Sequence, residues 1–119
     1  MGLTYPVKNV YWETGGQPPF KPDQGTPSNT NEPYLDWLNY VLGQSSIPQT
    51  ITSSYGDNEQ TVPRDYADSV CNQFMKLGAR GVSFLSSSGD GGVSGGQPSQ
   101  CQANDGSGDT KFLPTCKNL

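Results

Sequence analysis

The sequence has no histidine among its 119 residues. Histidine is the usual general base and a common zinc ligand, so Ser-His-Asp catalysis, Cys-His catalysis and histidine zinc sites are excluded. The sequence also has no run of about 18 apolar residues, which excludes a transmembrane helix. Basic side chains are few, with 7 Lys and Arg against 11 Asp and Glu and a net charge of −4. Nucleic acids and anionic membranes require a basic patch, so we expect neither as a partner.

Cysteine is scarce. The three cysteines are Cys71, Cys101 and Cys116, and none forms a CxxC motif, so we expect no metal site and no cofactor. One disulfide and one odd thiol is the simplest arrangement, and we favour Cys101–Cys116, which would stabilise the fold by about 3 kcal/mol. The odd cysteine is then either buried or links two chains, and an exposed sheet edge is a second route to a homodimer.

The composition is polar and rich in turn residues. It includes 15 Gly and 10 Pro, a pattern typical of secreted proteins. The first residues, "MGLTYPVKNV", lack a basic region followed by an apolar one, so this chain carries no recognisable signal peptide, and we expect a secreted protein whose leader has been removed.

Hydrophobic patterning predicts alternating strands and helices. Strands are expected over 5–14, 49–57 and 82–89, and helices over 31–43 and 62–81. Two long Gly/Pro/polar loops are expected, over 15–31 and 91–110. This order predicts one α/β domain over 1–119, a three-layer α/β/α sandwich whose mostly parallel sheet is covered by helices on both faces.

Each predicted helix has an apolar stripe and boundary residues. Asn31 and Thr61 are placed to cap the two helices, and Gly43 to end the first. The expected buried faces are Leu35, Trp37, Leu38, Val41 and Leu42 in the first helix, and Tyr66, Val70, Phe74 and Leu77 in the second.

Polar residues follow each predicted strand. In parallel sheets ligands bind beyond the carboxyl ends of the strands, so Glu13, Tyr55, Asp57 and Asp90 are expected near one rim. The alternative is that the Gly-Asp pairs only form good turns.

Three stretches together resemble a known family. "NEPYLDWL", "TITSSYGDNEQTVPRDYADSVCNQFMKLGARGVSFLSSSGDGG" and "TKFLPT" are similar to the middle of a fungal sedolisin, a serine-carboxyl peptidase. The resemblance covers roughly residues 2–115. It implies a truncated subtilisin-like α/β/α core and a secreted acid peptidase as the parent protein.

The resemblance supplies only part of a catalytic site. It implies that Asp90, in "SSGD", matches the family aspartate that stabilises the oxyanion when protonated. The family's nucleophilic serine lies in a "GTS" motif, which this sequence lacks, and its calcium loop is also missing. Glu32 and Asp36 have the i, i+4 spacing of the family's Glu/Asp base pair, but the family places that pair on an earlier helix. We therefore expect no enzymatic activity from these residues alone.

The polar rim suggests a binding function. Carboxylates, hydroxyls and aromatic rings suit sugars, so the sequence predicts a non-catalytic, lectin-like protein that binds a glycan or glycoprotein. Small secreted mushroom glycan-binding proteins are similar in size and expected architecture. The expected contacts are Asp90, Ser88, Asp57, Tyr55 and Trp12. The alternatives are an inactive fragment of a secreted acid serine-carboxyl peptidase, or a protein-binding effector or inhibitor that uses its long loops.

Overall fold

A computed structural model of the chain describes residues 2–23 and 26–91. Its elements are α1 (Tyr34–Leu42), β1 (Thr50–Ser53), the 3-10 turn η1 (Glu59–Thr61), α2 (Arg64–Ala79) and β2 (Ser83–Ser86). The chain is of the α/β class. Both predicted helices are confirmed, as are the second and third predicted strands, all somewhat shorter than expected. The predicted Cys101–Cys116 disulfide and nearly all of the 91–110 loop lie outside the described residues.

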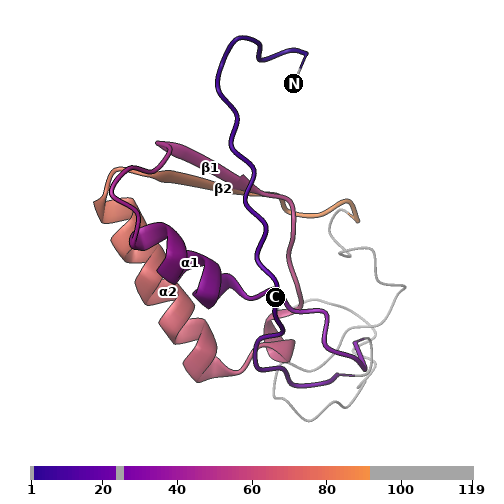
Figure 1. The fold of residues 1–119 in the computed structure, drawn as a ribbon. Helices are drawn as coiled ribbons and strands as arrows, with labels where there is room; N and C mark the ends of the chain where they lie inside the picture. Colours follow the sequence, from indigo (N-terminus) through magenta and orange to yellow (C-terminus); the bar gives the residue numbers. More distant parts are fainter. Residues whose placement is uncertain (1, 24–25, 92–119) are drawn as a thin grey trace, which may run out of the picture.

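The two strands form a parallel pair joined by α2. Thr50 lies opposite Ser83 and Ser53 opposite Ser86, so β1, α2 and β2 make one βαβ unit. Figure 1 shows α1 and α2 side by side on one face of this sheet. The described residues therefore form two layers, where the sequence predicts three. Parallel strands are normally buried on both faces, yet the side chains of Thr50, Thr52 and Leu85 are exposed.

A small core fills the space between the helices and the sheet. Its buried members are Leu38, Val41, Ile51, Leu77 and Val82. Leu38 and Val41 come from the predicted stripe of α1, and Leu77 from that of α2. The remaining stripe residues are only half-buried: Leu35, Trp37, Leu42, Tyr66, Val70 and Phe74.

The two predicted N-terminal helix caps, Asn31 and Thr61, are wrong, whereas Gly43 ends α1 as predicted. α1 begins after Pro33 and α2 after Pro63, and neither start has a side-chain cap. Asn31 and Thr61 instead bond to each other, because the Thr61 hydroxyl donates to Asn31 Oδ1 at 3.1 Å and Asn31 Nδ2 donates to the Thr61 carbonyl at 3.1 Å. A proline at the boundary sets φ before the first turn, which leaves both polar side chains available for this buried pair.

The predicted strand over 5–14 is also wrong. Residues 2–6 form turns, and residues 8–14 run as an extended stretch past the sheet (Figure 1). Within the described part of the chain, residues 8–14 make no backbone–backbone hydrogen bond. Their β-branched and aromatic composition suits a strand, but a strand forms only where a neighbour completes its ladder.

Candidate functional site

The turns that follow β1 and β2 leave the sheet at the same end. The strands are parallel with Ser53 opposite Ser86, and Ser87 N–H donates to the Ser53 carbonyl at 3.1 Å just beyond that pair. The "SSYGD" turn after β1 and the "SSSGD" turn after β2 therefore start side by side. This is the strand-end geometry on which ligand sites of parallel sheets are built.

Asp90 sits on an exposed turn. Gly89, just before it, has φ of +81°, a conformation that side-chain-bearing residues rarely adopt. An added Cβ at Gly89 would meet nothing within 4 Å, so backbone conformation and not space requires glycine there. Ser88 and Asp90 are both exposed, and neither lines the two cavities described below.

Tyr55 anchors the turn after β1 to the loop before α1. Its hydroxyl donates to the Thr30 carbonyl, while Thr30 Oγ1 donates to Asp57 Oδ1 at 3.2 Å. Partial burial raises the pKa of the Tyr55 phenol, and the negative charges of Asp57 and Glu32 raise it further. The phenol therefore stays protonated and remains a hydrogen-bond donor over the whole physiological pH range.

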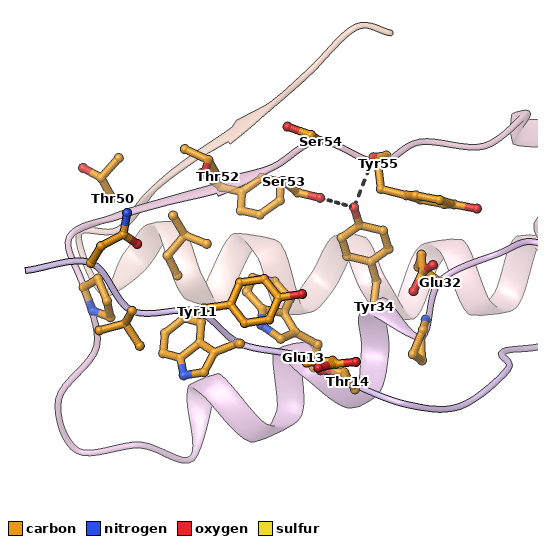
Figure 2. Close-up of a pocket in the computed structure, with 18 of the residues that line it drawn as sticks. Tyr11, Glu13, Thr14, Glu32, Tyr34, Thr50, Thr52, Ser53, Ser54 and Tyr55 are labelled. Atoms are coloured by element: carbon orange, nitrogen blue, oxygen red, sulfur yellow. Dashed lines mark hydrogen bonds between the residues drawn. The ribbon is translucent and has the colours of Figure 1, made fainter. Parts of the chain in front are cut away.

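A cavity of about 780 Å³ opens beside β1 (Figure 2). We call it the β1 groove. It is lined by residues 8–14 and 50–55 together with Glu32, Pro33, Tyr34, Trp37, Pro48 and Phe84. In Figure 2, Tyr11, Glu13 and Thr14 lie on one side and Thr50, Thr52 and Ser53 on the other, with Tyr34 between them.

Aromatic side chains form the base of the β1 groove. The ring centroids of Trp12 and Trp37 lie 6.4 Å apart, and those of Trp37 and Phe84 lie 5.8 Å apart. The Tyr34 hydroxyl lies 2.7 Å from Ser53 Oγ and donates to the Tyr55 carbonyl at 3.2 Å. The groove therefore combines an apolar base with polar groups along the β1 side.

A second cavity, of about 340 Å³, lies between the start of α1 and the face of α2. Its walls include Tyr66, Val70 and Phe74, and its rim includes Tyr55 and Asp57. Cys71 also lines it as an exposed free thiol. This cavity is smaller and more apolar than the β1 groove.

The predicted contact residues are divided among these places. Trp12 and Tyr55 line the β1 groove, Tyr55 and Asp57 line the smaller cavity, and Ser88 and Asp90 line neither. Glu13 lines the β1 groove as well. The sequence analysis did not identify Tyr34 as a site residue. Its spacing of three residues from Trp37 could have done so, because that spacing puts both rings on one side of α1.

Glu32 and Asp36 do not form a helical pair. Glu32 precedes α1, which begins at Tyr34, whereas Asp36 lies in its first turn. Across residues 2–23 and 26–91, no group of three or more His, Cys, Asp or Glu side chains is arranged to hold a metal ion. No helix in that same part of the chain is long and apolar enough to cross a membrane.

Sequence comparison finds that the chain is similar to fungal proteins. It is 44% identical to tripeptidyl-peptidase sed4 of Aspergillus fumigatus over 97% of its own length and 20% of that protein. It is 49% identical to tripeptidyl-peptidase SED4 of Arthroderma otae over 89% of the chain and 18% of the relative. It is also 43% identical to probable tripeptidyl-peptidase SED2 of Arthroderma benhamiae over 96% of the chain and 19% of the relative.

The chain thus spans about a fifth of the length of the curated relatives it matches. No protein-family model matches it. No solved structure matches it either. The relatives are named peptidases, so the prediction of a glycan-binding, lectin-like protein is wrong, and the peptidase alternative fits the comparison better. Carboxylates and aromatic rings at a strand end suit many polar ligands, including peptides, so these residue types do not distinguish a sugar site from a peptide site.

Proposed function

The chain is homologous over almost its whole length to fungal tripeptidyl-peptidases of the sedolisin family, and we propose that it forms part of the catalytic domain of such a peptidase. The observation that carries this proposal is the identity of 44% over 97% of the chain. The active protein is then a secreted enzyme that releases tripeptides at acid pH. In it, further sequence completes the three-layer sandwich.

Asp90 is the residue we assign to the reaction. The parallel pairing of β1 and β2 brings its turn to the same end of the sheet as the "SSYGD" turn, which supports a shared site at that end. In the protonated form the Asp90 carboxyl donates a hydrogen bond to the oxyanion that develops on the scissile carbonyl. Donors of this kind typically contribute a factor of about 10²–10³ to the rate.

These 119 residues alone are proposed to be inactive. The sequence has no "GTS" motif, and the resemblance places the family's Glu/Asp base pair outside it, so we propose that only one of the four catalytic side chains is present. Catalytic side chains of this kind act as a unit, and losing the nucleophile or the base removes most of the activity. We expect the 119-residue chain to show no casein hydrolysis above the buffer blank at acid pH. Hydrolysis that disappears in Asp90→Ala would contradict this part of the proposal.

A chimera tests the proposal directly. The homologous fifth of Aspergillus fumigatus tripeptidyl-peptidase sed4 is replaced by this chain, and tripeptide release is measured at acid pH. We expect an active enzyme, because the replacement preserves the Asp90 turn and its neighbouring strands. A secreted chimera with native-like circular dichroism but no tripeptide release would overturn the proposal.

Variants of the chimera test whether its activity depends on Asp90. Asp90→Ala is expected to lower kcat/KM by about 10²–10³-fold. Asp90→Asn keeps a hydrogen-bond donor at this position, so it is expected to retain part of the activity that Asp90→Ala loses. Asp68→Ala is the matched control, since Asp68 is an exposed acid on α2 whose contact with Arg64 spans 3.9 Å. It is expected to leave kcat/KM unchanged.

A further inference from the structure

The smaller cavity, between the start of α1 and the face of α2, combines an apolar wall with an acidic rim. Its wall consists of half-buried apolar and aromatic side chains from α2 and the turn before it: Val62, Tyr66, Ala67, Val70 and Phe74. Its rim carries the exposed carboxylates of Glu32, Asp57 and Glu59. Among the described residues, no lysine or arginine lines this cavity. It is therefore complementary to an apolar group that carries a positive charge.

Hydrogen bonds within the chain hold both sides of the smaller cavity in place. The Leu35 N–H donates to the Tyr66 hydroxyl at 3.1 Å, which ties α2 to the first turn of α1. On the rim, the Tyr55 hydroxyl donates to the Thr30 carbonyl, and Thr30 Oγ1 donates to Asp57 Oδ1 at 3.2 Å. Because these contacts position the lining residues already, little conformational freedom is lost when a ligand binds.

Two of the rim carboxylates act on the same point. Figure 2 shows Glu32 and Tyr55 on the same side of Tyr34. The negative charges of Asp57 and Glu32 both raise the pKa of the Tyr55 phenol, in addition to its partial burial, so both carboxylates lie close enough to that hydroxyl to affect it. A cation at the rim is attracted by the same two charges.

The smaller cavity lies beside the strand ends that carry Asp90. Asp57 and Asp90 each lie four residues beyond the last pair of the sheet, Ser53 and Ser86. Neighbouring strands are about 4.8 Å apart, and three extended residues span roughly 10 Å. These dimensions suit a peptide of about three residues that begins at the cavity and ends at the Asp90 turn.

The size of the smaller cavity favours a chain end over a continuing chain. With strands about 4.8 Å apart, sheet layers about 10 Å apart and a rise of about 3.3 Å per residue, one extended residue fills roughly 160 Å³. The cavity of about 340 Å³ then has room for one large residue and its amino group. A peptide that terminates there fits better than one that passes through.

We infer that the smaller cavity is the subsite for the N-terminal residue of a peptide substrate. An apolar side chain packs on Val70 and Phe74, and the free α-ammonium lies at Glu32 and Asp57. The inference rests on the proposed function, because the relatives are named tripeptidyl-peptidases and such an enzyme must select the bond after the third residue from a free amino end. A peptide whose amino end is blocked loses the attraction of both carboxylates.

Binding of short peptides to the 119-residue chain tests the subsite without catalysis. The probes are the C-terminal amides of Phe-Gly-Gly, N-acetyl-Phe-Gly-Gly and Gly-Gly-Gly. The backbone amide resonances of Tyr66, Val70 and Phe74 report on the cavity wall. We expect the Phe-Gly-Gly amide to shift these resonances in a saturable manner. N-acetylation, and replacement of the first residue by glycine, are each expected to weaken binding by about tenfold.

Neutral variants assign the ammonium contact. Glu32→Gln and Asp57→Asn are each expected to weaken binding of the Phe-Gly-Gly amide by about threefold. In the double variant the free and the acetylated peptide are expected to bind almost equally, because both charges that distinguish them are gone. Asp36→Asn is the matched control, since Asp36 is an exposed acid of α1 that lines neither cavity. It should keep the wild-type preference for the free amino end.

A second pair of variants assigns the apolar wall. Val70→Ser is expected to lower the preference for phenylalanine over glycine at the first peptide position by about threefold. Met75→Ser is its control, because Met75 lies on α2, is 61% exposed and lines neither cavity. Circular dichroism checks that each variant is folded. Should Val70→Ser fail to fold, the wild-type comparison of free and acetylated peptides still decides.

Three results would overturn the inference. They are the absence of a saturable shift with any peptide, equal binding of the free and acetylated peptides by the wild type, and an equal loss of preference in Asp36→Asn and Glu32→Gln. The chimera is read out independently. An active chimera without this binding preference rejects the subsite alone, and the preference together with an inactive chimera rejects the catalytic assignment alone.

Discussion

Two regions of this molecule have similarly apolar sequences and different surroundings. In the helix–sheet unit, Leu38 and Val41 of α1 are fully buried against Leu77 of α2. In the first eleven residues, Leu3 is fully exposed and Tyr11 is 84% exposed. The contrast shows that the apolar character of a segment decides little until a partner surface exists, because burial and not composition provides the stabilising free energy.

The largest effect is expected in the core. Leu38→Ala removes a fully buried side chain and leaves a cavity between α1 and α2, so it should lower the free energy of unfolding by about 2–5 kcal/mol. The matched change Leu3→Ala should alter it by less than about 0.5 kcal/mol. Urea titration followed by circular dichroism measures both. Equal losses would mean that the N-terminal segment is packed in solution.

Disrupting the Asn31–Thr61 pair is expected to cause the second-largest loss in the free energy of unfolding. Thr61→Val keeps the shape of the side chain but removes the hydroxyl that lies 3.1 Å from the buried Asn31 amide oxygen and 2.7 Å from the Asn58 carbonyl. The expected loss is about 1–3 kcal/mol in the free energy of unfolding. Thr52→Val, at an exposed position on β1, is the control and should stay within about 0.5 kcal/mol. A neutral Thr61→Val would show that water replaces the hydroxyl.

Trp12 is the point where the exposed segment meets the packed unit. Trp12→Ala removes the ring contact with Trp37 and should lower the free energy of unfolding by about 1 kcal/mol. Tyr11→Ala changes a neighbouring ring that is mostly exposed and should have no measurable effect. Near-ultraviolet circular dichroism should lose intensity in the first variant only. A larger loss of stability in Tyr11→Ala than in Trp12→Ala would mean that Tyr11, not Trp12, packs against the helices.

The smallest expected effect is a pH dependence in alkali. Burial raises the pKa of Tyr55, with Asp57 and Glu32 adding to it, and burial also raises the pKa of Tyr66. The unfolded chain loses these protons near pH 10, about where free tyrosine titrates, while the folded chain retains them. The folded state then binds more protons, so the contribution of these two phenols to stability is constant below about pH 10 and falls above it.

Urea titrations between about pH 8 and pH 11 test this window. The decline should be shallower in Tyr55→Phe and shallowest when Tyr66→Phe is added, because fewer phenols then titrate differently in the two states. Stability that rises above pH 10 would contradict the direction of both pKa shifts.

The sequence predicted the regions where local pattern and tertiary packing agree. The spacing of Leu38 and Val41 identified α1, and Gly43 marks its end, because an apolar stripe faces the core in any α/β arrangement. The order of strand, helix and strand over 49–89 predicted the parallel pairing. The resemblance to sedolisin-type peptidases rested on the motifs "SYGD", "LGARGVS" and "SSGD" in that order, and the similarity to curated tripeptidyl-peptidases confirms it.

Other features depend on contacts that a local pattern does not contain. The 5–14 segment has strand composition, but its pairing depends on a neighbour distant in sequence. Thr61 has the residue type of a cap, yet Pro63 sets the start of α2 and the hydroxyl turns to Asn31. The β1 groove is lined by residues far apart in the chain, and its base includes the contact between Trp12 and Trp37.

Arg80, at the end of α2, connects the last turns of both helices. Its guanidinium donates to the carbonyls of Leu42 and Gln44, each at 2.8 Å, and so holds the chain just where α1 ends. Fraying of either helix end breaks this two-point contact. We therefore expect the final turns of α1 and α2 to open together in hydrogen exchange, although 36 residues separate Arg80 from Gln44.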